Sequence, residues 1–209
     1  MPIRNHYLSA QLYKFLERTI LPLMEKIVKS PNQLTLLGAG MALVVPLGFY
    51  VNPVIGLSLM ILSGFSDMMD GVMAKAHHKE TPFGALLDSS LDRVSDLCFL
   101  IGFWILFLGT GREIPAAFLT FFACLSTFMI SYVKARAEGL GYKIEKGLME
   151  RVARILYLLL LALVTVFFKG FAETVLWIGL SVYCVMTVMT VFQRLIEAHG
   201  QFRKADYHT

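Results

Sequence analysis

Charged residues are scarce in this chain of 209 residues: they make up 16% of it, whereas 56% of the residues are hydrophobic. The mean hydropathy is +0.64. A soluble domain of this size could not bury so much apolar surface, so the composition excludes an ordinary globular protein and predicts an integral membrane protein. At roughly 20 apolar residues per span, the chain has room for about six membrane helices and hardly any for a separate extramembrane domain.

Several other features are missing. The three cysteines, Cys98, Cys124 and Cys184, lie singly inside apolar stretches, and their spacing suggests neither a metal site nor a disulfide framework. The formal charge of +4 is modest and no basic run suits a duplex, so we expect contact with anionic lipid head groups and no nucleic-acid partner. The N-terminus lacks the pattern of a removable signal peptide.

Six apolar stretches separated by turn residues predict six transmembrane helices. They cover residues 32–51, 53–75, 83–109, 114–137, 152–168 and 172–193. Before them, residues 3–29 combine helical apolar spacing with basic residues, which predicts an amphipathic helix along the membrane surface. We therefore expect an all-α integral membrane protein with an N-terminal juxtamembrane helix over 1–30, a six-helix domain over 31–195 and a short cytoplasmic tail over 196–209.

The distribution of basic residues predicts the orientation in the membrane. Of the 19 Lys and Arg residues, all but Arg112 and Lys169 fall on one side of the six predicted spans. Because basic residues accumulate on the cytoplasmic side, we expect a multi-pass protein of the cell membrane with both termini in the cytoplasm.

Acidic residues occur where a membrane helix should have none. Asp67 and Asp70 lie near the end of the second predicted span, and Asp88 and Asp92 lie at the start of the third. Each would cost roughly 2.5 to 3.5 kcal/mol at a helix centre, and spacings of three and four residues put the acids of each helix on one face. A cluster of carboxylate oxygens favours Mg²⁺, Mn²⁺ or Ca²⁺.

Other interpretations of these acids stay open. They could pair near the interface with the basic residues Lys75, Lys79 and Arg93, and Asp96 could be a partner of the site or of a basic residue. Intramembrane acids could also line the ion path of a cation transporter. A transporter is expected to show inverted repeats and helices broken at the bilayer midplane, and the sequence has neither feature.

The acids and their neighbours form a specific motif. Asp67-x-x-Asp70-Gly71-x-x-Ala74-Lys75, eight residues and Gly84-x-x-x-Asp88-x-x-x-Asp92 resembles the pattern D-x-x-D-G-x-x-A-R-x(8)-G-x-x-x-D-x-x-x-D of the CDP-alcohol phosphotransferases, also called class-I CDP-alcohol phosphatidyltransferases. Lys75 is the one departure, because it stands where the family has Arg. Lysine provides a point charge instead of a planar fork, so we expect looser phosphate contact at this position.

The resemblance implies a dimeric six-helix membrane enzyme of phospholipid biosynthesis, with its active site in a polar cavity at the cytoplasmic side. Such an enzyme transfers a phosphatidyl-type group from a CDP-lipid to an alcohol and releases CMP. It implies two Mg²⁺ or Mn²⁺ ions, with Asp67 and Asp88 bridging both, Asp70 completing one site, and Asp92 completing the other and acting as general base. The implied CDP-lipid contacts are Pro31, Asn32, Gln33, Leu34, Gly71, Lys75, Thr81 and Gly84. By themselves, Asn32 and Thr81 are typical of helix caps.

A second block of residues bears on the acceptor. Ser131-Tyr132-Val133-Lys134-Ala135-Arg136, Glu150-Arg151-Val152-Ala153-Arg154 and Gln193-Arg194 fall at predicted cytoplasmic helix ends. They are similar to the branch of the family that makes phosphatidylinositol phosphate or archaetidylinositol phosphate from a CDP-lipid (CDP-diacylglycerol or CDP-archaeol) and inositol phosphate. The resemblance implies that Ser131, Lys134, Arg154 and Arg194 bind the acceptor phosphate. Glycerol 3-phosphate is the alternative acceptor, and anchoring against anionic lipid is the alternative role for the cations.

Overall fold

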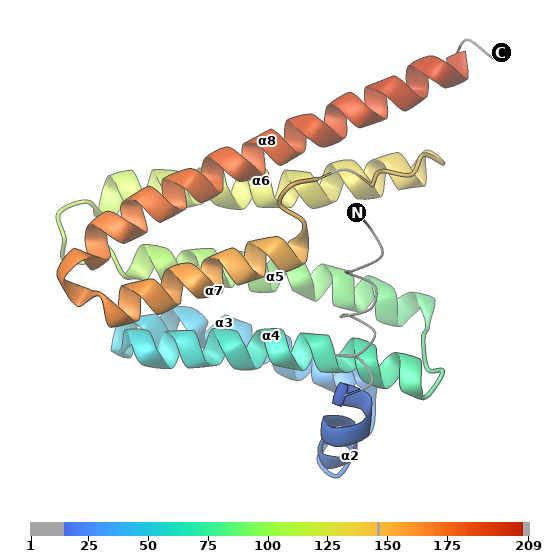
Figure 1. The fold of residues 1–209 in the computed structure, drawn as a ribbon, viewed down its shortest axis with the longest axis horizontal. Helices are drawn as coiled ribbons and strands as arrows, with labels where there is room; N and C mark the ends of the chain where they lie inside the picture. Colours follow the sequence, from blue (N-terminus) through green and yellow to red (C-terminus); the bar gives the residue numbers. More distant parts are fainter. Residues whose placement is uncertain (1–14, 146, 207–209) are drawn as a thin grey trace. The chain divides into compact units, whose positions relative to one another are not determined.

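The computed structural model describes residues 15–145 and 147–206, and all regular structure in these ranges is helical. The long helices, labelled in Figure 1, are α3 (Pro31–Val51), α4 (Pro53–Ala76), α5 (Pro82–Ile105), α6 (Glu113–Gly139), α7 (Arg151–Phe167) and α8 (Ala172–Asp206). The short elements are the π-helix η1 (Leu16–Ile20), α2 (Leu21–Met24) and the 3-10 helix η2 (Lys169–Phe171). The predicted all-α class is confirmed.

A long helix lies at each of the six predicted stretches, and four of these helices are long and apolar enough to cross a membrane. They are α3, α4, α6 and the part of α8 over Ala172–Arg203. Helix α5 carries acidic residues, and α7 has 17 residues, which corresponds to a rise of roughly 25 Å. The regular structure of residues 15–145 and 147–206 is thus that of a helical membrane protein.

Three long helices begin at a proline, which suits the first helical position because its missing N–H would have no partner there. Pro31 starts α3 directly after Ser30, as the sequence predicts. The side chain of Asn52 accepts a hydrogen bond from the Val54 N–H at 2.9 Å at the start of α4. The Thr81 hydroxyl accepts one from the Gly84 N–H at 3.0 Å, so Thr81 caps α5.

The predicted N-terminal amphipathic helix is described only in part, because residues 1–14 lie outside the described ranges. From residue 16 onward its apolar side is packed against the protein. The buried cluster comprises Leu16, Leu21, Val28, Leu34, Met69, Val72 and Met73. A hydrogen bond between the side chains of Glu25 and His77 further ties this segment to the loop after α4. At the other terminus, α8 continues as a helix to Asp206 through most of the predicted tail.

The described chain divides into two compact units. The first contains residues 15–44 and 58–95, which include η1, α2, most of α3 and α4 and the first part of α5. The second contains residues 45–57 and 96–206, which include the remainder of α5 and the helices α6 to α8. Each unit is described by itself below.

In the first unit, small residues allow α3 and α4 to approach closely. The Ser63 hydroxyl donates to the Gly38 carbonyl at 2.8 Å, and the Ser66 hydroxyl donates to the Leu34 carbonyl at 2.9 Å. A Cβ atom added at Gly38 would lie 3.2 Å from the Ser63 carbonyl oxygen, which is tighter than ordinary contact. Close backbone approach with serine hydrogen bonds is a usual way to join helices in a membrane.

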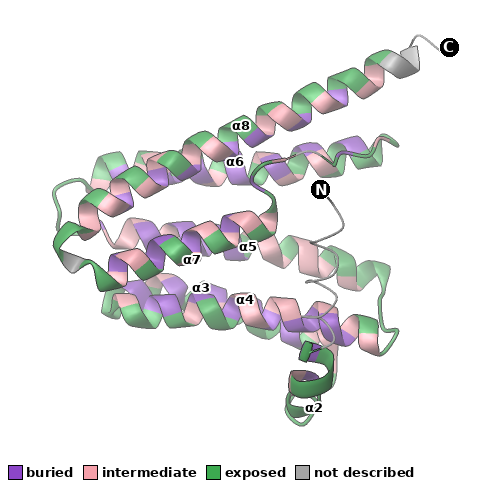
Figure 2. Ribbon diagram, viewed as in Figure 1, coloured by how far each residue is buried: buried purple, intermediate pink, exposed green. Residues whose placement is uncertain are grey.

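In the second unit, α8 packs along α6 and α7, and buried residues follow one side of each helix (Figure 2). Paired hydroxyl groups join α6 to α8: Ser126 lies 2.7 Å from Thr187, and Thr127 lies 2.9 Å from Tyr183. Tyr157 of α7 donates to the Gly179 carbonyl of α8 at 2.8 Å. These buried polar groups are therefore satisfied by neighbouring helices.

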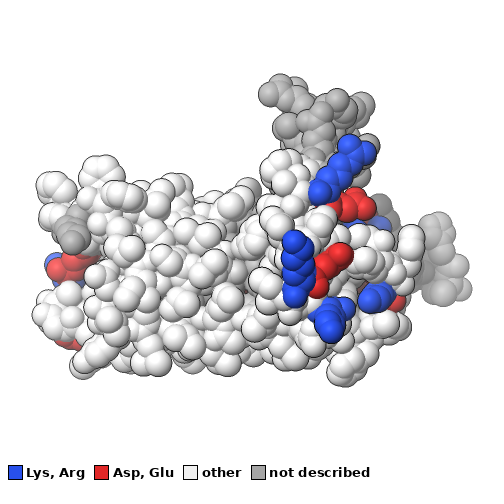
Figure 3. Space-filling view, turned by 90° about the horizontal axis from the view of Figure 1, so that it is seen from below, with Lys and Arg blue, Asp and Glu red and all other residues white. Residues whose placement is uncertain are grey.

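Apolar side chains are exposed along the long helices, as expected where lipid is the solvent. In α3, Leu43, Leu47 and Tyr50 are 59%, 64% and 70% exposed. In Figure 3 the Lys, Arg, Asp and Glu side chains gather in a few places, and other residues form most of the visible surface. This separation of apolar and charged surface is typical of helices that lie in a bilayer.

Candidate functional site

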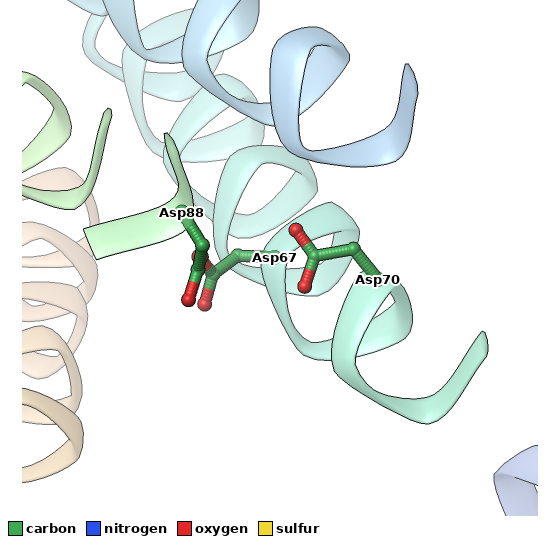
Figure 4. Close-up of side chains that lie close together, drawn as sticks. All are labelled: Asp67, Asp70 and Asp88. Atoms are coloured by element: carbon green, nitrogen blue, oxygen red, sulfur yellow. The ribbon is translucent and has the colours of Figure 1, made fainter. Parts of the chain in front are cut away.

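Three of the four predicted metal-binding aspartates come together in the first unit. Asp67 and Asp70 lie in α4 and Asp88 lies in α5, and one carboxylate oxygen from each lies within 4.8 Å of the other two (Figure 4). The three acids share one location because α4 and α5 are joined by a short loop and the spacing within α4 is three residues. Asp92, one helical turn after Asp88, is half-buried and does not belong to this group of three.

The donor set suits a hard divalent cation. All of its atoms are carboxylate oxygens, the ligands that Mg²⁺, Mn²⁺ and Ca²⁺ prefer. One oxygen of Asp70 is buried without a hydrogen-bond partner in the described structure. A buried carboxylate oxygen without a partner is costly, and a bound cation would satisfy it. The residues present therefore fit a divalent metal.

A cavity of about 190 Å³ opens beside these acids in the first unit. It is formed by the N-terminal ends of α3 and α5, the C-terminal end of α4 and the loop between α4 and α5. The lining residues are Pro31, Asn32, Thr35, Asp70, Gly71, Ala74, Lys79, Glu80, Thr81, Gly84, Ala85 and Asp88. A cation, an amide, hydroxyl groups and carboxylates thus meet in one place, which suits a polar phosphorylated ligand.

The cavity brings together most of the residues that the motif suggests for CDP-lipid contact. Pro31, Asn32, Gly71, Thr81 and Gly84 all line it. A Cβ atom added at Gly84 would lie 3.0 Å from the Thr81 hydroxyl oxygen and 3.4 Å from the Asn32 amide oxygen. Glycine at this position therefore keeps the cavity wall open between these two polar side chains.

Three of the suggested contacts lie outside the lining. The side chain of Leu34 is 1% exposed and belongs to the buried apolar cluster that also contains Leu16 and Leu21 of the N-terminal segment. Gln33 is exposed, and its amide oxygen accepts a hydrogen bond from the Lys29 N–H at 3.0 Å. Lys75 is exposed near the end of α4.

Sequence reasoning missed three polar residues of the cavity, Thr35, Lys79 and Glu80. Thr35 follows Pro31 by one helical turn, and its hydroxyl donates to the Pro31 carbonyl at 3.2 Å. Helical spacing from Pro31 could have identified it. Lys79 enters the lining because His78 adopts a positive φ of 52°, which turns the chain after α4. The sequence predicts a break between the two spans here, but it does not indicate the positive φ of His78.

The second unit holds the residues suggested for the acceptor phosphate, and two of them are buried arginines. Arg154 is 3% exposed; it donates to Asp96 at 2.8 Å and to the Met149 carbonyl at 3.1 Å. Arg194 is 6% exposed and donates to the Ile130 carbonyl at 2.6 Å. The contact to Arg154 matches one of the two roles that the sequence leaves open for Asp96, the charge partner of a basic residue.

The other two suggested acceptor residues are more accessible. Lys134 has a side chain that is 45% exposed and lies 3.9 Å from Glu138 one turn later in α6. Ser131 is half-buried in the same helix. Both residues belong to the second unit, as do Arg154 and Arg194.

Comparison with known proteins identifies related sequences. The family model described as CDP-alcohol phosphatidyltransferase matches residues 28–191. The archaetidylinositol phosphate synthase of Methanothermobacter thermautotrophicus is 34% identical over 160 residues, which cover 76% of this chain and 79% of that protein. The phosphatidylinositol phosphate synthase of Streptomyces avermitilis is 31% identical over 208 residues, which cover 93% of this chain and 84% of that protein.

Solved structures show the same fold. The crystal structure of Mycobacterium tuberculosis phosphatidylinositol phosphate synthase with CDP-DAG bound matches with a TM-score of 0.73 and 30% identity, covering 87% of this chain and 94% of that one. A structure of that enzyme in complex with manganese and citrate matches with a TM-score of 0.74 and 30% identity, covering 87% and 88%.

Proposed function

The chain belongs to the CDP-alcohol phosphatidyltransferase family, and we propose that it transfers the phosphatidyl-type group of a CDP-lipid to a hydroxyl group of inositol phosphate, with release of CMP. The observation that carries this proposal is the group of Asp67, Asp70 and Asp88 beside the polar cavity. A pyrophosphate is densely anionic, so a site for it needs cations. Acids in a membrane helix are explained if they hold those cations.

We propose that Asp67, Asp70, Asp88 and Asp92 hold two Mg²⁺ or Mn²⁺ ions. Support comes from the oxygen-only donor set, from the buried Asp70 oxygen without a partner, and from the manganese complex of the related enzyme. When bound, the ions neutralise the pyrophosphate and stabilise the leaving CMP. Asp92 is proposed as general base: its carboxylate takes the proton of the attacking hydroxyl group.

Asp92→Asn tests this assignment. The substitution keeps the shape of the side chain and removes its basicity, so we expect CMP release to fall at least about a hundredfold while CDP-lipid binding stays largely intact. Single-turnover CMP release and equilibrium binding of the CDP-lipid measure the two effects separately. Activity within about tenfold of the wild type would contradict the role as base.

We propose that the cavity binds the cytidine diphosphate part of the donor. Asn32, Thr81, Gly71 and Gly84 line it, and the related enzyme has a structure with CDP-DAG bound. Pro31, Gln33 and Leu34 would contribute through the backbone at the start of α3, since the side chains of Gln33 and Leu34 lie elsewhere. Lys75 and the cavity residue Lys79 are both cations near the end of α4, and either would suit a phosphate.

The proposed acceptor is inositol phosphate, bound by Ser131, Lys134, Arg154 and Arg194. The burial of two guanidinium groups supports a phosphate at this place, because anchors against lipid head groups need not be buried. Relatives over most of the chain are named as synthases of phosphatidylinositol phosphate and archaetidylinositol phosphate. Neutral inositol would not require such cations.

The membrane arrangement is also a proposal. We propose six spans, with α5 and α7 joining the four long apolar helices, and with both termini and the cavity on the cytoplasmic side. In α7, a stripe of exposed apolar side chains supports contact with lipid: Val152, Leu156, Leu160, Leu163 and Phe167. A homodimer is proposed from the family resemblance, and light scattering of the protein in detergent would measure its mass.

The central experiment measures CMP release by the purified protein in detergent with CDP-diacylglycerol and Mg²⁺. Inositol phosphate, glycerol phosphate, free inositol and serine are compared as acceptors, each with and without EDTA. We expect release with inositol phosphate that EDTA abolishes and that added Mg²⁺ or Mn²⁺ restores. Preference for glycerol phosphate would keep the metal site and overturn the acceptor assignment. If no acceptor works with this donor, CDP-archaeol is the next donor to compare.

A substitution separates the acceptor from the donor. Arg194→Ala is expected to raise the KM for inositol phosphate far more than the KM for the CDP-lipid. Arg136→Ala is the matched control, because Arg136 is an exposed arginine at the end of α6. Equal effects of Arg194→Ala on the two substrates would contradict the acceptor role.

A further inference from the structure

A buried carboxylate in the second unit has no place in the mechanism described so far. Asp96 of α5 is 4% exposed, and its partner Arg154 of α7 is 3% exposed. The Arg154 guanidinium donates to the Asp96 carboxylate at 2.8 Å. Burying two charges costs several kcal/mol for each, roughly as much as their attraction returns, so apolar side chains would join α5 and α7 at least as well. A contribution to stability therefore does not explain why this ion pair is present.

The hydrogen bonds of Arg154 fix the orientation of its guanidinium. Nη2 donates to Asp96 and Nη1 donates to the Met149 carbonyl at 3.1 Å, whereas Nε is buried without a hydrogen-bond partner in the described structure. A buried N–H without an acceptor is unfavourable. Two of the three guanidinium nitrogen atoms, Nη1 and Nη2, thus donate to the protein. The Nε–H remains to donate to an oxygen atom of a ligand.

A second guanidinium is held beside the same segment of chain. Met149, which accepts from Arg154, donates its own N–H to the Thr190 hydroxyl of α8 at 3.1 Å. Two residues earlier, a Cβ atom added at Gly147 would lie 3.2 Å from Nε of Arg194. Arg154 and Arg194 are thus two buried cations beside the same segment of chain. Since like charges disfavour each other when buried, the Asp96 carboxylate stabilises this arrangement.

We infer that Asp96 is a positioning residue of the acceptor site: it holds the Arg154 guanidinium so that its remaining donor serves the phosphate of the acceptor. The inference rests on the proposed function and adds a residue that does not itself touch substrate. We expect the Asp96 carboxylate to strengthen binding of the acceptor phosphate and to have no effect on binding of the CDP-lipid or of the metal ions.

Asp96→Asn tests the inference, since it removes the charge and keeps the shape. We expect the KM for inositol phosphate to rise about tenfold, as for loss of a hydrogen bond to a charged group, and the KM for the CDP-lipid to stay within about twofold. The control is Glu145→Gln, because Glu145 is an exposed carboxylate of the same unit, paired with Lys143 at 3.0 Å. Equal changes in the two KM values, or a fall in kcat alone, would overturn the inference.

A double-mutant cycle with R154Q shows whether Asp96 acts through Arg154. We expect D96N to raise the KM for inositol phosphate in the wild-type background and to leave it unchanged in the R154Q background. A further rise in the R154Q background would overturn the inference. If D96N alone does not yield folded protein, judged by Tm in detergent, R154Q and the double variant, in which both charges are absent, still make that comparison.

The same measurements separate this inference from the proposed function. If the wild type releases no CMP with inositol phosphate from either CDP-diacylglycerol or CDP-archaeol, the proposed function fails. If the wild type is active and D96N leaves the KM for inositol phosphate unchanged, the function stands and only the positioning role of Asp96 is overturned.

Discussion

The two units of the molecule differ in how their functional charged side chains are arranged. In the first, Asp67, Asp70 and Asp88 bring three carboxylates within 4.8 Å of one another beside a cavity, and one Asp70 oxygen has no partner in the described chain. In the second, Arg154 is bound by Asp96 and by a backbone carbonyl, and Arg194 by the Ile130 carbonyl. Like charges gathered at a cavity suit a bound cation, whereas the protein partners of Arg154 and Arg194 fix the orientation of these two side chains.

The helix contacts of the two units also differ. In the first unit, serine hydroxyl groups bind backbone carbonyls of α3, and glycine lets the helices approach. In the second unit, hydroxyl side chains bind one another across α6 and α8. The first arrangement depends on a short distance between backbones, and the second depends on matched side chains. Substitutions can distinguish these dependences.

The largest expected effect is on the carboxylate group of the first unit. Asp88→Asn removes one of the three clustered charges, and we expect CMP release to fall roughly a thousandfold or more, because several kcal/mol of charge stabilisation by the metal is lost. CMP release is measured over a range of Mg²⁺ concentrations. Glu173→Gln, at an exposed pair with Arg112 in the second unit, should leave it unchanged. A loss of less than about tenfold would show that Asp88 is not a metal ligand.

The next effect concerns the close approach of α3 and α4. Gly38→Val places a side chain against Ser63 and Ser66, and we expect it to lower stability by about 1 to 3 kcal/mol, measured as a fall in Tm in detergent. Gly40→Val is the matched control in the same helix, since a Cβ atom there meets nothing within 4 Å. Equal Tm values for the two variants would contradict the tight contact.

A smaller effect is expected for the hydroxyl pairs of the second unit. Tyr183→Phe removes the buried partner of Thr127, which lies 2.9 Å away, so we expect a loss of about 1 kcal/mol with no change in either KM. The exposed Tyr132 provides the control substitution, Tyr132→Phe. If both variants melt at the wild-type temperature, this pair does not stabilise the contact between α6 and α8.

The smallest effect is expected for an exposed ion pair. Glu138→Gln removes the charge that lies 3.9 Å from Lys134, and we expect a change in stability below about 0.5 kcal/mol, because solvent screens the pair. The comparison is with Asp96→Asn at the buried pair of the same unit, and Tm in detergent measures both. A larger loss at Glu138 than at Asp96 would contradict the distinction between exposed and buried pairs.

Local patterns explain what could be predicted. The apolar stretches locate the six long helices, and Pro31, Pro53 and Pro82 start three of them. The carboxylate spacing of three and four residues puts acids on one face of a helix, and a short loop turns the next helix back toward it. The motif therefore predicts a group of four aspartates, of which Asp67, Asp70 and Asp88 lie together in the structure.

Long-range packing explains what could not be predicted. Asp96 and Arg154 are 58 residues apart. Helical spacing predicts which face of its own helix each residue occupies, but it does not predict which residue of another helix it contacts. Lys79 reaches the cavity through the positive φ of His78, a conformation that non-glycine residues rarely adopt. The resemblance implies Leu34 as a CDP-lipid contact, whereas its side chain is buried in a cluster with residues of the N-terminal segment.

The sequence by itself determined that this is a helical membrane protein of the CDP-alcohol phosphatidyltransferase family, with a carboxylate site in α4 and α5, because these features depend on composition and on spacing within single helices. The tertiary structure alone decided which polar residues line the cavity and that Asp96 fixes Arg154. Those contacts depend on how helices distant in the chain pack, and a periodic pattern along one helix does not specify its neighbour.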